Sequence, residues 1–154
     1  MPKVYVLVGV PGSGKSTWAK NQDWLQNCVY ISTDELVEEH ARQEGKTYTE
    51  VFNDYMSEAV ELMTKQVIQA REQGRDIVWD QTSTSIASRK KKFRLLPDYE
   101  HIAVVFHEPP ISELKKRLDS RPGKIIPWEV VSNMINNFDM PSTNEGYKEI
   151  WYVT

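Results

Sequence analysis

Residues 9 to 16 read Gly-Val-Pro-Gly-Ser-Gly-Lys-Ser, and they match the pattern G-x-x-x-x-G-K-[ST] at every fixed position. Glycines let a backbone wrap a phosphate so that successive N–H groups point inward, and a helix beginning there adds favourable electrostatics. An apolar run at residues 3–8 precedes the motif as a predicted strand, and residues 16–25 follow it as a predicted helix. This stretch therefore predicts a phosphate-binding loop between the first strand and the first helix.

Two side chains at the end of the motif have separate tasks. Lys15 can bridge the β- and γ-phosphates of a nucleoside triphosphate, and the Ser16 hydroxyl can ligate Mg²⁺. The motif thus predicts binding of ATP or GTP with Mg²⁺. The candidate nucleotide-binding residues in and beside the loop are Gly9, Pro11, Gly12, Ser13, Gly14, Lys15, Ser16 and Thr17.

The remainder of the chain alternates short apolar runs with helix-length segments, which predicts an α/β fold with a parallel sheet and right-handed crossovers. No linker or internal repeat interrupts this alternation, so residues 1–154 are expected to form a single domain. Strand order does not follow from periodicity. The expected strands are 3–8, 28–31, 76–79, 101–106 and 148–153, and the expected helices are 16–25, 34–43, 50–73, 85–96 and 112–138.

Composition excludes several classes of protein. With 40% hydrophobic and 27% charged residues, the chain of 154 residues has enough apolar material for one globular core. Its single cysteine, Cys28, excludes an internal disulfide framework and fits a reducing, intracellular compartment. No apolar run approaches the length of about 20 residues that a membrane helix needs.

The charge is uneven along the chain. The net charge of −3 argues against a protein that coats nucleic acid through its overall field. Residues 85–124, however, hold ten lysines and arginines against five acidic residues. Any anionic ligand is therefore expected to bind locally, within or near this basic stretch.

Two carboxylates follow predicted strands, where ligands bind in open α/β sheets. Asp80 comes directly after the third strand and is expected to hold Mg²⁺ through Ser16 or water, with capping of the next turn as the alternative. Asp34 follows the second strand. Its position alone supports two alternatives equally. Asp34 could orient or deprotonate a phosphoryl acceptor, or it could be the N-cap of the next helix.

Several of these residues together resemble the 5′-kinase module of bacteriophage-type polynucleotide kinases. The resemblance covers nearly the whole chain and is more specific than the phosphate-binding loop alone. It rests on Pro-Gly-Ser-Gly-Lys-Ser-Thr-Trp-Ala at 11–19, Asp34, Asp80-Gln81-Thr82, Glu113-Leu114-Lys115-Lys116-Arg117, Arg121, Lys124, Pro127 and the helix that follows.

The resemblance implies a P-loop kinase-like, three-layer α/β/α fold with about five parallel strands and a helical lid at about residues 115–127. It implies that Asp34 is the general base, that Arg121 in the lid stabilises the transferring phosphates, and that Arg117 lies nearby on the nucleotide. The implied reaction is transfer of the γ-phosphate of ATP, with Mg²⁺, to the 5′-hydroxyl end of DNA or RNA. The implied partners are therefore nucleic acid ends, with no role for a membrane.

The sequence departs from the family pattern at two positions. Members often carry an arginine three residues after the base, where it binds the phosphate beside the acceptor hydroxyl, and Val37 stands there instead. Ser83 replaces an asparagine that follows the Asp-x-Thr triplet in many members. The expected acceptor contacts are therefore Thr82 together with Arg89 or Lys92 from the basic run, with a solvated helix face as the alternative for that run.

Two other functions remain open at this level. A small-molecule kinase for a nucleoside, sugar or antibiotic could use the same scaffold, because one fold accepts many substrates. A nucleotide-dependent switch without catalysis is the third reading, and a lid arginine beside a candidate base argues against it. Neither the preference for DNA or RNA nor the residues that recognise adenine follow from the sequence, and Tyr147 with nearby positions before the last strand are candidate neighbours of adenine.

Overall fold

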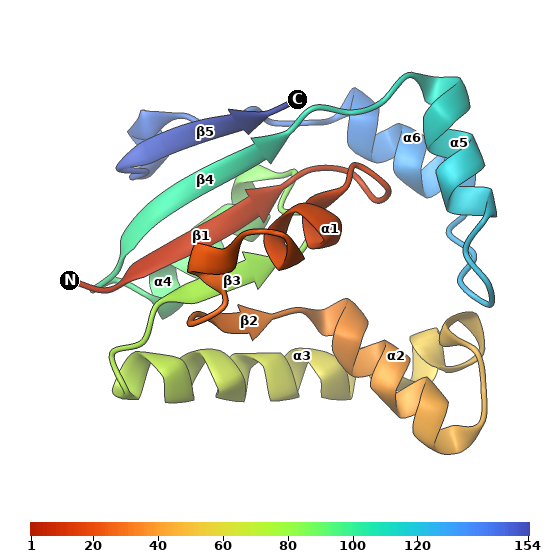
Figure 1. Ribbon diagram of the computed structural model, residues 1–154, viewed down its shortest axis with the longest axis horizontal. Helices are drawn as coiled ribbons and strands as arrows, with labels where there is room; N and C mark the ends of the chain where they lie inside the picture. The colour runs from red at the N-terminus through yellow and green to blue at the C-terminus, as the bar shows by residue number, and fades with distance from the viewer.

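A computed structural model describes all residues 1–154 and contains one five-stranded, fully parallel sheet in the order β2-β3-β1-β4-β5 (Figure 1). β1 lies in the middle, and every residue in it after Lys3 is buried, because Val4, Val6 and Val8 pack on one face of the sheet and Tyr5 and Leu7 on the other. The strands are β1 Lys3–Val8, β2 Val29–Ile31, β3 Ile77–Asp80, β4 Glu100–Phe106 and β5 Glu149–Val153.

Helices cover both faces of this sheet. On one face α1 and a short 3-10 turn, η1, pack on Tyr5 and Leu7, and on the other face α3 packs on Val6 and Trp79. The three-layer α/β/α arrangement with five parallel strands confirms the predicted fold class. The helices are α1 Lys15–Lys20, α2 Thr33–Glu44, α3 Tyr48–Glu72, α4 Ile86–Leu95, α5 Ile111–Asp119 and α6 Trp128–Asn136, with 3-10 turns η1 Asp23–Leu25 and η2 Thr143–Glu145.

Two predicted helices were too long. The helix expected at 16–25 ends at Lys20, because Gln22 adopts an extended conformation before η1 begins. The helix expected at 112–138 is two helices, α5 and α6, joined by residues 120–127. α5 ends at Asp119 with Ser120 as its C-cap, Gly123 in the connection has a left-handed φ of 68°, and Pro127 precedes α6 as its N-cap.

The parallel sheet brings the carboxyl ends of its strands to one side of the molecule, which is the right side in Figure 1. The phosphate-binding loop follows β1 there, α2 begins two residues after β2, and Asp80 ends β3. The connection between α5 and α6 reaches back to the start of α3, where the amide of Thr49 donates to the carbonyl of Gly123 at 3.1 Å. The candidate side chains thus gather at one edge beneath this connection.

None of the helices combines the length and the apolarity that crossing a bilayer requires. Cys28, expected at the start of the second strand, lies just before β2 and is only partly buried.

Candidate active site

The phosphate-binding loop has the backbone that its glycines predict. Gly12 and Gly14 have φ values of 84° and 95°, in the left-handed region that residues with a Cβ rarely adopt. The amides of Gly14, Lys15, Ser16 and Thr17 donate to no carbonyl or side chain of the protein. The buried Ser13 hydroxyl also has no hydrogen-bond partner. This set of free donors at a helix N-terminus fits the phosphates of a nucleotide.

Lys15 is buried against the same loop. Its ammonium donates to the carbonyl oxygens of Gly9 and Val10 at 2.8 and 2.9 Å. Burial lowers the pKa of Lys15 to about 8, although the Asp80 and Asp34 carboxylates oppose the shift. Both present partners are neutral, so a phosphate oxygen would bind this ammonium more strongly than they do.

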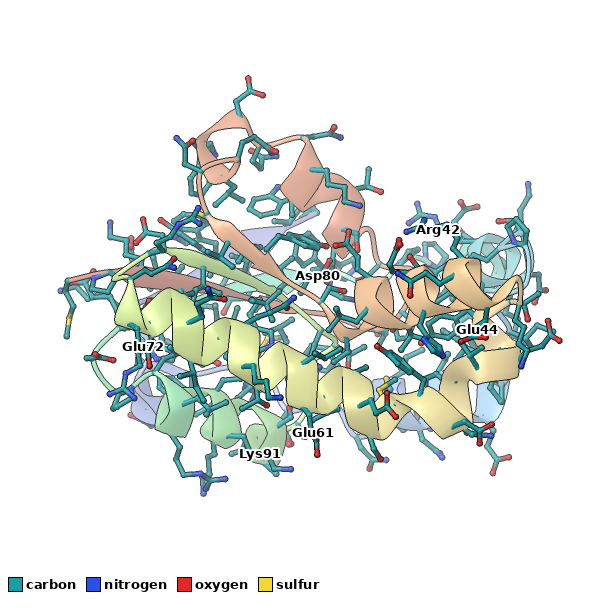
Figure 2. The ribbon with its side chains drawn as sticks, turned by 90° about the horizontal axis from the view of Figure 1, so that it is seen from below. Arg42, Glu44, Glu61, Glu72, Asp80 and Lys91 are labelled. Atoms are coloured by element: carbon teal, nitrogen blue, oxygen red, sulfur yellow. The ribbon has the colours of Figure 1, made fainter.

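The predicted Mg²⁺ ligands lie together. The Ser16 hydroxyl donates to Oδ2 of Asp80 at 2.6 Å, and the Tyr30 hydroxyl donates to the same oxygen. Figure 2 shows Asp80 in the middle of the molecule, where it lies 5% exposed at the end of β3. A hydroxyl and a carboxylate are the oxygen ligands that Mg²⁺ prefers, so this pair fits the ion. Asp80 meets side chains from two other elements and is not limited to capping its own turn.

Sequence reasoning missed Tyr30. Its hydroxyl reaches Asp80 because β2 pairs with β3 and places Tyr30 opposite Val78. A tyrosine near the end of a short strand was visible in the sequence, but its partner depends on strand order. Periodicity does not reveal strand order.

Asp34 is the second residue of α2 and does not cap it. Ser32 is the N-cap, since its side chain accepts from the amide of Glu35, so the capping alternative for Asp34 is wrong. The Tyr48 hydroxyl donates to Oδ1 of Asp34 at 2.8 Å, and the Lys124 ammonium donates to Oδ2 at 3.1 Å. Asp34 is thus an exposed carboxylate with both oxygens held, and its charge opposes the lowering of the Lys15 pKa by burial.

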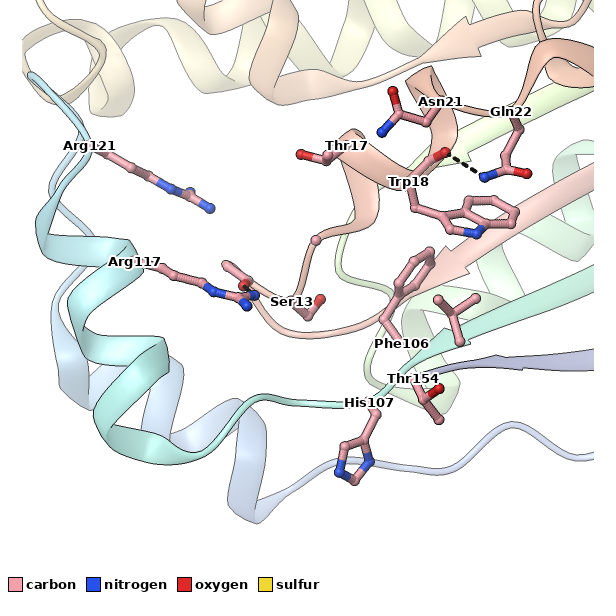
Figure 3. Close-up of a pocket in the computed structure, with 13 residues that line it drawn as sticks. Ser13, Thr17, Trp18, Asn21, Gln22, Phe106, His107, Arg117, Arg121 and Thr154 are labelled. Carbon is pink, nitrogen blue, oxygen red and sulfur yellow. Dashed lines mark hydrogen bonds between the residues drawn. The ribbon is translucent and has the colours of Figure 1, made fainter.

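A cavity of about 550 Å³ opens beside the phosphate-binding loop (Figure 3). Arg117 in α5 and Arg121 in the connection between α5 and α6 line it together with Gly12 and Thr17. Trp18 and Phe106 meet edge to face at the opposite end, with ring centroids 5.5 Å apart. The remaining lining residues are Ser13, Gly14, Asn21, Gln22, His107, Val153 and Thr154.

This cavity has the size and polarity of a nucleotide site, with cations beside the loop and aromatic rings further away. Arg117 is already engaged, because its Nε donates to Glu113 and its Nη1 donates to the carbonyl of Gly12. The guanidinium of Arg121 forms no hydrogen bond or ion pair with the protein, so it is available to a ligand.

The prediction that Tyr147 lies beside the adenine of the nucleotide was wrong. Its ring is 4% exposed and packs 4.8 Å from Phe93, on the face of the sheet that α3 and α4 cover. The aromatic side chains that line the cavity are Trp18 and Phe106. Trp18 lies in α1, on the other face of the sheet.

Arg89 and Lys92 do not line the acceptor side, so that expectation was also wrong. Arg89 is fully buried, with Nε 2.8 Å from Glu145 Oε1 and Nη1 2.8 Å from the carbonyl oxygen of Ser83. Lys92 is 5% exposed and its ammonium lies 5.0 Å from the ring centre of Trp79. The carbonyl of Thr82 accepts from the amide of Gly9 at 2.9 Å, while acceptor contact by its side chain stays a prediction.

Replacing Lys92 by methionine is expected to stabilise the fold by about 2 kcal/mol at pH 7. Burial lowers the pKa of Lys92 from 10.5 to about 8, helped by the charges of Arg89 and Lys91. Burying the charged ammonium therefore costs about 3 kcal/mol of stability, which Lys92→Met recovers. The substitution also loses the contact with Trp79, which contributes about 1 kcal/mol.

The sign of the pH dependence follows. Between pH 8 and pH 10.5 the unfolded chain binds more protons at Lys92 than the folded chain, so the wild type gains stability as the pH rises. The advantage of Lys92→Met should therefore shrink from pH 7 to pH 9.5 in urea unfolding. Lys91→Met, at an exposed neighbouring position, is the control. A loss of stability in Lys92→Met at pH 7 would show instead that the ammonium anchors α4.

Comparison with known proteins agrees with this geometry. The sequence profile of the AAA domain family matches residues 4–141. The human (Homo sapiens) protein heterogeneous nuclear ribonucleoprotein U-like protein 2 is 26% identical over 162 residues, an alignment that covers 97% of this chain and 21% of that protein. The chain thus spans about a fifth of the length of this relative.

Two solved structures are similar. A chain in the Pnkp1/Rnl/Hen1 RNA repair complex is 25% identical, with a TM-score of 0.65 over 88% of this chain and 43% of that one. A candidate kinase from Chloroflexus aurantiacus is 16% identical, with a TM-score of 0.73 over 99% of this chain and 84% of that one, and shows the fold alone. With the phosphate-binding loop after β1 and the parallel sheet, these matches show that the chain belongs to the AAA domain family and has a P-loop kinase-like fold.

Proposed function

We propose that the chain transfers the γ-phosphate of ATP to the 5′-hydroxyl end of DNA or RNA. The observation that carries this proposal is the carboxylate of Asp34, which is held at the same edge of the sheet as Lys15 and the Ser16–Asp80 pair but outside the nucleotide cavity. The likeness to a chain of the Pnkp1/Rnl/Hen1 RNA repair complex supports a polynucleotide as the acceptor.

Each residue then has one task. The free amides of residues 14–17 and the Lys15 ammonium hold the phosphates, and Arg121 stabilises the charge on the transferring group. Ser16 and Asp80 would hold Mg²⁺, which would supply further charge neutralisation. Asp34 accepts the hydroxyl proton as the acceptor oxygen bonds to phosphorus and the bond from phosphorus to the ADP oxygen breaks.

The test is transfer of labelled γ-phosphate from ATP and Mg²⁺ to a panel of 5′-hydroxyl oligonucleotides, nucleosides and sugars. We expect label on the oligonucleotides, and about a hundredfold lower kcat in Asp34→Asn because the amide cannot accept the proton. Asp98→Asn is the matched control, since Asp98 is an exposed carboxylate paired with Arg71 away from the site. Label on the small acceptors alone would contradict the polynucleotide proposal.

A small-molecule kinase is the second candidate, and α2 carries the observation that favours it. Val37 is fully buried among Ala41, Val51 and Ala59, so the turn after Asp34 presents Glu38, a carboxylate, on its accessible side. The negative charge of Glu38 repels a polyanionic acceptor but has little effect on the binding of a neutral one. Phosphorylation of a neutral acceptor at a rate insensitive to ionic strength would favour this candidate.

A further inference from the structure

The hydroxyl of Tyr30, in the edge strand β2, contacts the candidate active site at Asp80. It donates to Oδ2, the same carboxylate oxygen that accepts from the Ser16 hydroxyl at 2.6 Å. The other oxygen, Oδ1, accepts no hydrogen bond from the protein, although Asp80 is only 5% exposed. Two donors thus hold one oxygen of this carboxylate, and the second oxygen stays free for a ligand.

The ring of Tyr30 is held independently of its hydroxyl. Tyr30 lies opposite Val78 in the parallel pairing of β2 with β3. Its ring packs against the apolar cluster on the α1 face of the sheet, which includes Val78 and Ala19. The ammonium of Lys20 lies 5.8 Å from the ring centre. Phenylalanine at position 30 can make all of these contacts, so the hydroxyl is not required to anchor the edge strand.

A second donor changes what the Asp80 carboxylate can do. One hydrogen bond does not fix a carboxylate, because its terminal torsion has a broad energy minimum. Ser16 belongs to α1 and Tyr30 to β2, so the two donors approach Asp80 from different elements and together restrict its rotation. Removing a group that orients a metal ligand typically weakens metal binding by about 10- to 100-fold. The Tyr30 hydroxyl has the place of such an orienting group.

We propose that Tyr30 is a positioning residue for the magnesium site, whose hydroxyl holds the Asp80 carboxylate in the orientation that Mg²⁺ requires and so sets the affinity for the nucleotide with its metal. The inference rests on the magnesium role of Ser16 and Asp80 in the proposed function. It adds a residue that acts through Asp80 and that belongs to no phosphate-binding motif.

Two other roles for the hydroxyl make different predictions. A hydroxyl that only anchors β2 affects the stability of the fold and leaves the dependence on Mg²⁺ unchanged. A hydroxyl that competes with the ion for Oδ2 predicts that nucleotide binds more tightly in Mg²⁺ once the hydroxyl is removed. Nucleotide binding with and without the metal therefore distinguishes the three roles.

The experiment measures the dissociation constant of a non-hydrolysable ATP analogue by calorimetry, once in excess Mg²⁺ and once in EDTA. No acceptor is present, so the result is independent of the acceptor's identity. In Tyr30→Phe we expect the constant in Mg²⁺ to rise about tenfold and the constant in EDTA to stay unchanged. In an Asp80→Asn background, Tyr30→Phe should have no further effect, because its effect passes through that carboxylate.

Tyr99→Phe is the matched control. The Tyr99 hydroxyl is likewise held inside the protein, where it donates to the carbonyl oxygens of Ala70 and Arg75 at 3.2 and 2.6 Å, and it touches no residue of the site. Its removal therefore imitates the loss of a tyrosine hydrogen bond without disturbing Asp80. We expect both dissociation constants to stay at the wild-type values in this variant.

The remaining outcomes contradict the inference. An equal rise of both constants in Tyr30→Phe would show that the hydroxyl shapes the phosphate-binding loop, and no change in either would show an anchor alone. A lower constant in Mg²⁺ would show competition with the ion. Equal constants in Mg²⁺ and EDTA in the wild type would remove the magnesium role of Ser16 and Asp80, and the inference with it. Failure to label oligonucleotides would remove the polynucleotide acceptor and leave this inference standing.

Discussion

Replacing Arg121 by alanine is expected to lower kcat for phosphoryl transfer about a thousandfold, the scale on which an arginine acts at a transferring phosphoryl group. The guanidinium lines the same cavity as Gly12 and Thr17 and bonds to no protein group (Figure 3). It is close enough to Lys15 to lower the pKa of that ammonium. The Arg121 guanidinium can therefore donate two hydrogen bonds to the γ-phosphoryl group as negative charge develops there.

Two matched variants sharpen this result. Arg117→Ala removes a guanidinium that lines the same cavity but is bonded to Glu113 and to the carbonyl of Gly12, so we expect a loss of less than about tenfold. Arg42→Ala, on exposed α2, should leave kcat unchanged. The measurement is the kcat and the KM for ATP of each variant, from steady-state kinetics at varied ATP concentration. If Arg121→Ala raised the KM for ATP and kept kcat, the arginine would bind the ground state and the transition state equally.

Replacing Arg89 by methionine is expected to destabilise the fold by about 3 to 5 kcal/mol, the cost of breaking one side of a buried ion pair. Arg89 is fully buried and donates to both carboxylate oxygens of Glu145, which is 12% exposed, and to the carbonyl of Ser83. Methionine would leave Glu145 charged without its partner and Ser83 without its donor. Thermal unfolding should show Tm lower by roughly 10 °C.

The control is Arg71→Met, because Arg71 pairs with Asp98 at an exposed site where such pairs contribute less than about 1 kcal/mol. The double variant Arg89→Met with Glu145→Gln should recover part of the loss, since no buried charge then remains. Equal destabilisation by Arg71→Met and Arg89→Met would show that Arg89 acts as an ordinary surface charge.

Local sequence was enough to predict the fold and the nucleotide half of the site. Glycines at fixed spacing, a lysine and a serine define the loop within eight residues, and each short apolar run became a strand. Asp80 ends β3, so its place followed from the rule that ligands bind at carboxyl ends of strands. These features depend on neighbours in the chain and hold for any strand order.

The acceptor half could not be predicted in the same way, because its contacts join distant residues. Lys124 meets Asp34 across 90 positions, and this pair has no signature in the sequence. The basic run at 89–94 gave a false signal. Its charge count was correct, but the rotation of α4 directs Arg89 and Lys92 into the protein.

The sheet order gives the two walls of the nucleotide cavity different local stabilities. β1, which carries the phosphate-binding loop, has a strand on each side, whereas β5, which carries Val153, pairs only with β4. Amide exchange with solvent reports such local opening, and an edge strand opens at lower free energy than a central one. Amide exchange is therefore expected to be faster in β5 than in β1, so the cavity wall at Val153 is less stable than the wall that carries the phosphate-binding loop.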